Sequence, residues 1–517
     1  MQYLETKIDP SILSHLFIVH IPELIYNKGN YIYKWRGAIH LRRILPMTET
    51  RMKLPLFDDY WIDFRYNTQR RWFAPETYSL CPAGPYASMF YDPERKAYRI
   101  YYEVMEDLGN DDQRQLKMME STDLKTFTPV LNSQGSDVLY YSESGIHGAS
   151  VLYDPFDPDP ARRYKFCGMT RMERCRKGEN TEVEIAFSAD GIQWENNHEY
   201  IAHPYTSDAL NKLIYNPLKD EYCLFHRAAF VERRICMKTS KDMKNWTDSR
   251  TVLQPGPNYN NGHTGMQHYS MTGAYMDGIF YGLLWRYNTS LYDMEFSRMF
   301  GFMEPELVYS YDGNEYLYTS GKPLMERPLP PTPGCVGLAP DDICESADGK
   351  DYYIICFGYV FVHGTPESNK RLYDAVKDKD VKNCNPIYKI RKDGFCGLES
   401  VGLGGKVITK GIQLLKDDLS FNIRANYGFV RFGLMKKNGE FYEGFSFDDC
   451  IPFEYDDSVD VRPRWKEHEL KELLGKQVRV AIELNTAILH CITATARPFV
   501  RQPQVSFADP MGLPIPQ

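Results

Sequence analysis

A pair of strand-like runs joined by a polar turn recurs five times along this chain, and this repeat constrains its fold most. Each copy has apolar residues before the turn and aromatic residues after it, as in Ala87–Asp92 followed by Tyr98–Tyr102. The turns recur about every sixty to seventy residues, a period typical of propeller blades, and their central residues are Asp92, Asp154, Asn216, Asp277 and Asp348. Because no helical pattern separates the copies, the sequence predicts an all-β chain with a five-bladed β-propeller.

A second motif, Ser-x-Asp with an aromatic residue four positions after the aspartate, occurs near the end of each of four blades. Its copies are Ser121–Phe127, Ser188–Trp194, Ser240–Trp246 and Ser310–Tyr316. Aspartate accepts hydrogen bonds from its own turn and tolerates left-handed neighbours, so the motif indicates a tight hairpin. We expect the aromatic residue to pack between neighbouring blades, and we interpret these aspartates as turn residues rather than catalytic acids.

The composition excludes several other classes of protein. Aromatic residues make up 14% of the 517 residues, which favours β-structure. The net charge of −8 offers no basic surface for nucleic acid, and no apolar run reaches the roughly 18 residues that a membrane span needs. The 12 cysteines contain no C-x-x-C pair, so we expect no structural metal, no cofactor and no disulfide framework. The beginning of the chain lacks the pattern of a secretory signal, which predicts a cytoplasmic protein.

Changes in the pattern along the chain predict four segments. Residues 1–50 show no clear period and are expected to wrap a blade through a short helix and loops. Residues 51–395 are assigned to the propeller, which a strand at 54–63 opens. Residues 396–496 alternate apolar and polar side chains, as in a β-sandwich. The Pro-rich tail 497–517 is expected to lie extended, and the sandwich or this tail offers a surface for a homo-oligomer.

Several segments resemble glycosyl hydrolase proteins of the family 32/43-like five-bladed class. They are Leu56-Phe-Asp-Asp-Tyr-Trp-Ile-Asp, the five turn repeats, Arg391-Lys-Asp-Gly-Phe, Gly439–Cys450, Arg464-Trp-Lys and Leu473–Val480. The resemblance covers about residues 50 to 495 and implies a catalytic propeller followed by a C-terminal β-sandwich. One motif departs from it: Cys81–Met89 contains no carboxylate where family 32 enzymes carry their nucleophile. This departure argues against a fructosidase mechanism.

The geometry of a propeller narrows the position of the site. Residues just before the first strand and just after the second strand of each blade gather on one face around the central axis. Cleavage of a glycosidic bond there requires two carboxylates that flank the bond. The acids at these positions are Glu103, Glu143, Asp208, Asp341 and Asp342, and we expect Asp208 to form the pair with Glu143, Asp342 or Glu103.

Basic and aromatic residues occupy the equivalent positions and are predicted to bind the substrate. They are His147, Arg171, Arg227, His263, His268, Trp285, Arg286 and His363. The arginines of blades two, three and four either bind an acidic sugar or pair with the neighbouring acids. Trp285 suits stacking on the face of a sugar.

Three hypotheses of function follow from these residues. The first is a glycoside hydrolase that removes a terminal sugar from an oligosaccharide or glycoside. The second is a carbohydrate-binding propeller without catalysis, which the missing carboxylate in 81–89 favours. The third is a sialidase-like enzyme for an acidic sugar, which the Ser-x-Asp turns and three arginines suggest but which five repeats rather than six disfavour.

Overall fold

The computed structural model describes residues 24–27, 30–35, 38–40, 51–104, 114–140, 145–170, 181–195, 198–227, 233–255, 266–289, 301–326, 337–360, 363, 370, 374, 383–400 and 404–498. Near the N-terminus, β1 (Leu24–Asn27), β2 (Asn30–Trp35) and β3 (Ala38–His40) form a three-stranded antiparallel sheet. The helix expected before residue 25 and the tail beyond 498 lie outside the described residues, and the wrapping of a blade stays a prediction.

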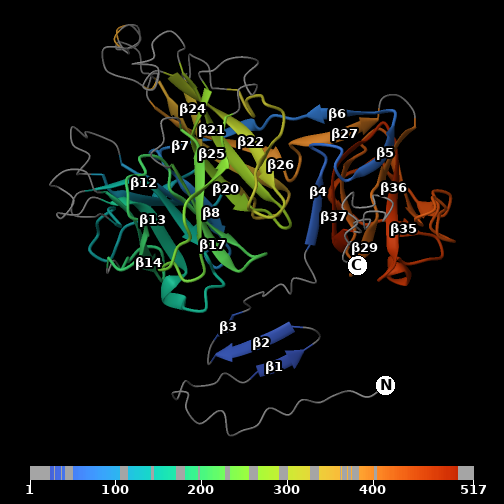
Figure 1. The fold of residues 1–517 in the computed structure, drawn as a ribbon, viewed down its shortest axis with the longest axis horizontal. Coiled ribbons are helices and arrows are strands. Elements are labelled where there is room, and N and C mark those ends of the chain that lie inside the picture. Colours follow the sequence, from blue (N-terminus) through green and yellow to red (C-terminus); the bar gives the residue numbers. More distant parts are fainter. Residues whose placement is uncertain are drawn as a thin grey trace, which may run out of the picture.

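Five four-stranded antiparallel sheets confirm the predicted five-bladed propeller (Figure 1). In blades one to four the strands follow one another along the chain. Blade one contains β8 (Ser88–Asp92), β9 (Ala97–Glu103), β10 (Leu116–Ser121) and β11 (Thr128–Pro129). Blade two contains β12 (Ile146–Tyr153), β13 (Tyr164–Thr170), β14 (Glu182–Ser188) and β15 (Ile201–His203). Blade three contains β16 (Lys212–Asn216), β17 (Glu221–Arg227), β18 (Ile235–Ser240) and β19 (Arg250–Leu253). Blade four contains β20 (Met266–Tyr275), β21 (Phe280–Thr289), β22 (Gly301–Ser310) and β23 (Leu317–Tyr318).

The fifth blade closes the ring with a strand from the other end of the propeller. It contains β24 (Gly337–Glu345), β25 (Asp351–Tyr359) and β26 (Asn385–Arg391), and β7 (Glu76–Cys81) pairs with β26 as the outermost strand. The first strands of the blades neighbour one another in a closed ring, β8, β12, β16, β20 and β24. They begin at Ser88, Ile146, Lys212, Met266 and Gly337.

The Ser-x-Asp motifs form the expected hairpins. At the third copy, Ser240 Oγ accepts a hydrogen bond from the backbone N–H of Met243 at 2.9 Å. Asp242 Oδ1 accepts two more, from the N–H groups of Lys244 at 2.9 Å and Asn245 at 2.8 Å. Met243 takes a positive φ of 62°, and Trp246 packs in a hydrophobic cluster shared by blades two and three. These aspartates therefore hold turns, as predicted.

The strand expected to open the propeller belongs instead to the C-terminal domain. Residues 51–72 form β4 (Arg51–Pro55), β5 (Ile62–Tyr66) and β6 (Thr68–Trp72), which pair with β37, β28 and β27 of that domain. Figure 1 shows these blue strands among the orange and red strands of the C-terminal half. The physical reason is burial, because Leu54, Leu56 and Ile62 lie in the core of the C-terminal domain.

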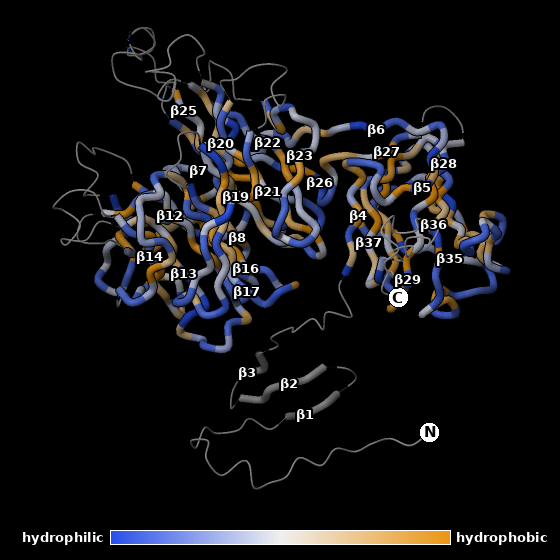
Figure 2. The backbone as a smooth tube through the Cα atoms, in the orientation of Figure 1, coloured by the Kyte–Doolittle hydropathy of each residue, from blue (hydrophilic) through white to orange (hydrophobic). Residues whose placement is uncertain are grey.

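The C-terminal domain is a nearly closed twelve-stranded sheet, consistent with the predicted sandwich. Val478, Val480, Ile482 and Leu484 alternate along one long strand and are all fully buried, as the sequence pattern predicts. Figure 2 shows hydrophobic residues within both domains. The strands are β27 (Cys396–Ser400), β28 (Gly405–Thr409), β29 (Ile412–Leu414), β30 (Ser420–Arg424), β31 (Phe429–Met435), β33 (Phe453–Glu454), β34 (Asp457–Val461), β36 (Gln477–Asn485) and β37 (Ile488–Pro498), with β4, β5 and β6.

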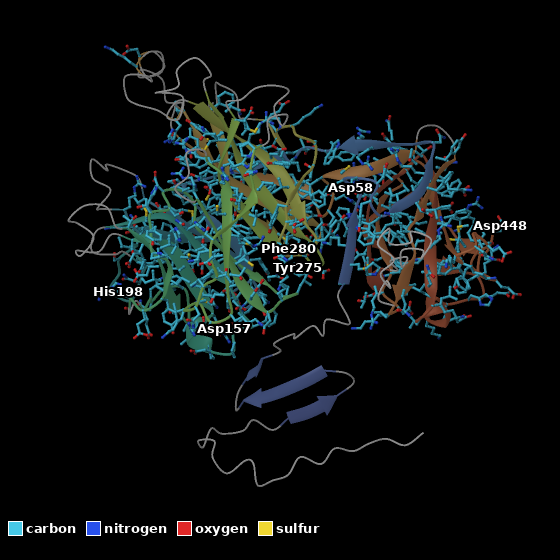
Figure 3. All side chains as sticks on the ribbon, in the orientation of Figure 1. Asp58, Asp157, His198, Tyr275, Phe280 and Asp448 are labelled. Carbon is cyan, nitrogen blue, oxygen red and sulfur yellow. The ribbon has the colours of Figure 1, made fainter. Side chains whose placement is uncertain are left out.

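The two domains share a buried junction. Phe57 and Cys396 pack in one hydrophobic cluster with residues of blades four and five, such as Tyr309. Asp58 accepts a hydrogen bond from the Tyr309 hydroxyl and lies between the two domains (Figure 3). Lys53 Nζ lies 2.9 Å from Asp393 Oδ2, and both side chains are at least nine-tenths buried. The junction therefore combines apolar packing with a buried ion pair.

In the part of the chain that the structure describes, two short 3-10 helices, Pro160–Arg162 and Leu470–Leu473, interrupt the β-structure. Within the described ranges, no helix has both the length and the apolar character to cross a membrane.

Candidate functional site

One imidazole ring lies between two carboxylates, and the three side chains come from three successive blades. His147 Nε2 lies 3.0 Å from Asp208 Oδ1, and His147 Nδ1 lies 3.7 Å from Glu103 Oε2. Glu103 ends β9 of blade one, His147 lies in β12 of blade two, and Asp208 precedes β16 of blade three. The structure therefore brings these three candidate residues together.

A glycine brings the blades together at this point. Gly148 has a positive φ of 61° and lies at a register shift in β12. A Cβ atom there would lie 1.8 Å from the carbonyl oxygen of Ala209, so only glycine lets the segment with Asp208 approach His147. The next residue, Ala149, donates its N–H to Glu103 Oε1 at 2.6 Å. The local backbone thus positions both carboxylates relative to the imidazole.

Opposite charges shift the protonation of this cluster. Burial favours the neutral form of Asp208, but its hydrogen bond with His147 and the charges of His147 and Arg227 lower its pKa to about 2. Burial also lowers the pKa of His147, yet its hydrogen bond with Asp208 and the nearby carboxylate of Glu103 outweigh burial and raise it, against the charge of Arg114. Asp208 is therefore ionised, and its carboxylate is the most exposed of the three groups, with 59% of its side-chain surface accessible.

A wall of stacked aromatic rings supports one side of the cluster. Trp285 stacks between Tyr86 and Tyr269, with ring centroids 5.7 and 6.0 Å away. Its Nε1 donates a hydrogen bond to the carbonyl of Pro340 at 2.6 Å, and its side chain is fully buried. Trp285 therefore lies between the two tyrosines and is covered on both sides. Tyr86 contacts His147, with its hydroxyl 3.5 Å from Nε2.

His363 and Arg227 complete the same side. The Tyr269 hydroxyl lies 3.2 Å from His363 Nε2, and the Tyr287 hydroxyl lies 3.3 Å from His363 Nδ1. Arg227 Nη2 lies 3.2 Å from Asp208 Oδ2, and the guanidinium carbon lies 4.8 Å from the centroid of Tyr269. The carboxylate of Asp208, the guanidinium of Arg227 and the ring of Tyr269 therefore lie next to one another.

The two adjacent aspartates of blade five have different environments. Asp342 Oδ1 pairs with Lys212 Nζ at 2.7 Å, and Asp342 Oδ2 accepts the N–H of Met89 at 3.0 Å. These bonds join the inner strands of blades one, three and five. Burial raises the pKa of Asp341 well above its usual range, and Asp342 and Glu103 add to this effect, against the backbone N–H of Ala87. Asp341 is thus a fully buried carboxyl group whose neutral form is favoured.

Two other predicted residues point into the blades rather than toward the cluster. His268 Nε2 lies 3.1 Å from the Tyr318 hydroxyl, and burial lowers the pKa of His268 to about 3. Arg286 donates to the carbonyl of Gly321 at 2.9 Å. Both side chains bond to residues of blade four and therefore stabilise that blade. The sequence analysis expected them to contact the substrate instead. Glu143, Arg171 and His263 lie outside the described residues.

Sequence analysis missed two arginines of the site. Arg114 contacts His147 Nδ1 through a short hydrogen bond. Arg233 lies with its guanidinium carbon 5.3 Å from the centroid of Tyr269. Both precede the third strand of their blade, β10 and β18, and third strands also begin at this face. Their position just before a third strand could have identified them from the sequence. No group of three His, Cys, Asp or Glu side chains arranged for a metal ion occurs in the described parts of the chain.

Comparisons with known proteins find remote likeness in structure alone. No family model and no curated protein matches the sequence. An N-acetylgalactosamine deacetylase from F. plautii has 11% identity and a TM-score of 0.41, covering 63% of this chain and 96% of its own. A GH43 endo-arabinanase from Bacillus licheniformis has 12% identity and a TM-score of 0.35, covering 61% and 96%. A glycosyl hydrolase from Bacteroides ovatus has 10% identity and a TM-score of 0.37, covering 67% and 92%. At these values the likeness assigns neither an activity nor a substrate.

Proposed function

We propose that this protein is a glycoside hydrolase whose catalytic carboxylates are Asp208 and Glu103. The observation that carries the proposal is their contact with opposite nitrogens of the His147 ring, at 3.0 and 3.7 Å. One imidazole ring between them keeps the two carboxyl groups within roughly 9 Å of each other, inside the range that hydrolysis of a glycosidic bond uses. The departure from the family 32 motif fits this proposal, because neither acid comes from segment 81–89: Glu103 ends the second strand of blade one, and Asp208 precedes blade three.

The environments of the groups suggest different roles. Asp208, with a pKa of about 2, is ionised and accessible, so it acts as nucleophile, as base toward water, or as stabiliser of positive charge on the sugar. Glu103 is fully buried, so it acts on the substrate only through His147. The raised pKa of His147 favours a proton on the imidazole, which donates it to the leaving group.

A panel of aryl glycosides and oligosaccharides tests the proposal. We expect the full-length protein to hydrolyse at least one member, and Asp208→Asn to abolish most of that activity while the fold is retained. Asp448→Asn is the matched control, since Asp448 is 96% exposed in the C-terminal domain, far along the chain from the cluster. Absence of turnover on the whole panel would contradict the proposal.

A carbohydrate-binding propeller without catalysis is the second candidate. The complete burial of Glu103 favours it, because a catalytic acid normally reaches its substrate directly. Calorimetric binding to panel members without hydrolysis of any of them would support this alternative over the first.

A further inference from the structure

Two arginines of blade three share one aromatic ring beside Asp208. The guanidinium carbons of Arg227 and Arg233 lie 4.8 and 5.3 Å from the centroid of Tyr269. Arg233 also lies over Tyr287 at 5.2 Å. Guanidinium groups stack on tyrosine rings with their N–H donors directed to the sides, so stacking leaves the donors open for another partner.

Among the described residues, the positive charge at this position exceeds the negative charge that faces it. Asp208 contacts Arg227 at 3.2 Å. Arg233, in contrast, donates a hydrogen bond to the neutral amide oxygen of Gln267 at 2.8 Å. Burial lowers the pKa of Arg233, and the charge of Arg227 adds to this effect, against Tyr269, Tyr287 and Asp208. Arg227 Nη1 is buried and has no hydrogen-bond partner in the described part of the chain.

Two neighbouring guanidiniums with a buried unused donor are costly unless an anion binds them. Resting on the proposed function, we propose that Arg227 and Arg233 bind an anionic substituent of the substrate, a carboxylate or sulfate on the sugar beside Asp208. A planar carboxylate or a sulfate accepts paired N–H bonds from guanidinium groups, and such charge-assisted bonds are strong. Asp208 is itself held by one of the two arginines, so the anion lies next to the hydrolysed bond.

Binding without turnover tests this inference on the full-length chain. The probes are oligomers of galacturonate and glucuronate, their neutral methyl esters, and galactose oligomers with and without 6-sulfate, measured by calorimetry. We expect at least one acidic probe to bind roughly tenfold or more tightly than its neutral counterpart, the size of one charge-assisted hydrogen bond. A preference for uronates over sulfated probes, or the reverse, identifies the anion.

Variants connect the preference to the arginines. Arg233→Gln is expected to bring the ratio of acidic to neutral binding close to one, whereas Arg233→Lys keeps part of it. Arg462→Gln, at a 45% exposed arginine of the C-terminal domain, is the matched control and leaves the ratio unchanged. Because like-charge repulsion falls in Arg233→Gln, its thermal stability is expected to be retained. If that variant does not fold, the wild-type protein is measured at high salt instead. Its preference for acidic probes is then expected to be lost, because salt screens the charge interaction.

The outcomes separate this inference from the proposed function. Equal binding of acidic and neutral probes by the wild-type protein overturns it, as does an unchanged ratio in folded Arg233→Gln. Hydrolysis of neutral glycosides without any preference for acidic probes overturns this inference and leaves the hydrolase standing. Tight binding of acidic probes without hydrolysis supports the anion site and contradicts the hydrolase.

Discussion

The Nε2 atom of His147 lies 3.0 Å from the Oδ1 atom of Asp208. This contact joins the inner strand of blade two to the segment that enters blade three, across the close approach that Gly148 permits. Because Glu103 of blade one faces the opposite nitrogen of the ring, a change in Asp208 or Glu103 alters the protonation of His147.

Asp208→Asn is expected to leave the fold intact and to lower the rate of glycoside hydrolysis by orders of magnitude. Asparagine has nearly the same volume as aspartate, while the negative charge next to His147 is lost. The measurements are thermal unfolding and the rate on whichever glycoside the protein hydrolyses. An unchanged rate in a folded variant would remove Asp208 from the mechanism, and attention would pass to Glu143 and Asp342.

The pKa of His147 is expected above its ordinary value of 6.5, because Asp208 and Glu103 favour the imidazolium form. A raised pKa in the folded state contributes stability that is full below pH 6.5 and is lost as pH rises through the folded pKa. Titration of the imidazole followed by NMR measures it directly. In Asp208→Asn the His147 pKa should fall, and an unaltered value would show that the contact carries no charge interaction.

Lys53→Met is expected to destabilise the protein by about 3–5 kcal/mol, because it leaves Asp393 buried without its cation. Asp393 Oδ1 also accepts bonds from Tyr281 and Tyr352, each at 2.8 Å, which hold it in place. Denaturation by urea measures the loss. The control is Lys436→Met at the exposed pair with Glu440, where a change of about 0.5 kcal/mol is expected. A similarly small change at Lys53 would contradict the assigned role of the ion pair.

Removing residues 51–72 is expected to be as damaging as removing residues 400–517. Both deletions take strands from the same sheet and expose the cluster that Phe57 and Cys396 share with blades four and five. Soluble yield and gel filtration of the chain without residues 51–72 and of the chain without residues 400–517 supply the test. A soluble, stable fragment would show that the propeller does not depend on packing against the C-terminal domain.

Local chemistry explains why the blades could be predicted from the sequence. A turn at Asp92 or a hairpin at Asp242 is stabilised by hydrogen bonds to residues two and three positions away. Such signals lie within a short segment, so their period reports the number of blades. The same reasoning placed Glu103, His147, Asp208 and Arg227 on one face, because strand direction alternates within each blade.

Contacts between distant segments were decided only by the tertiary structure. The pairing of β7 with β26 joins residues about 300 positions apart, and β4–β6 enter a sheet whose other strands begin at Cys396. Nor does any local pattern distinguish Asp342, bound to Lys212, from Asp341, whose pKa burial raises. Alternation reports which residues face inward, whereas the partner of a buried charge depends on which strands the closed ring brings side by side.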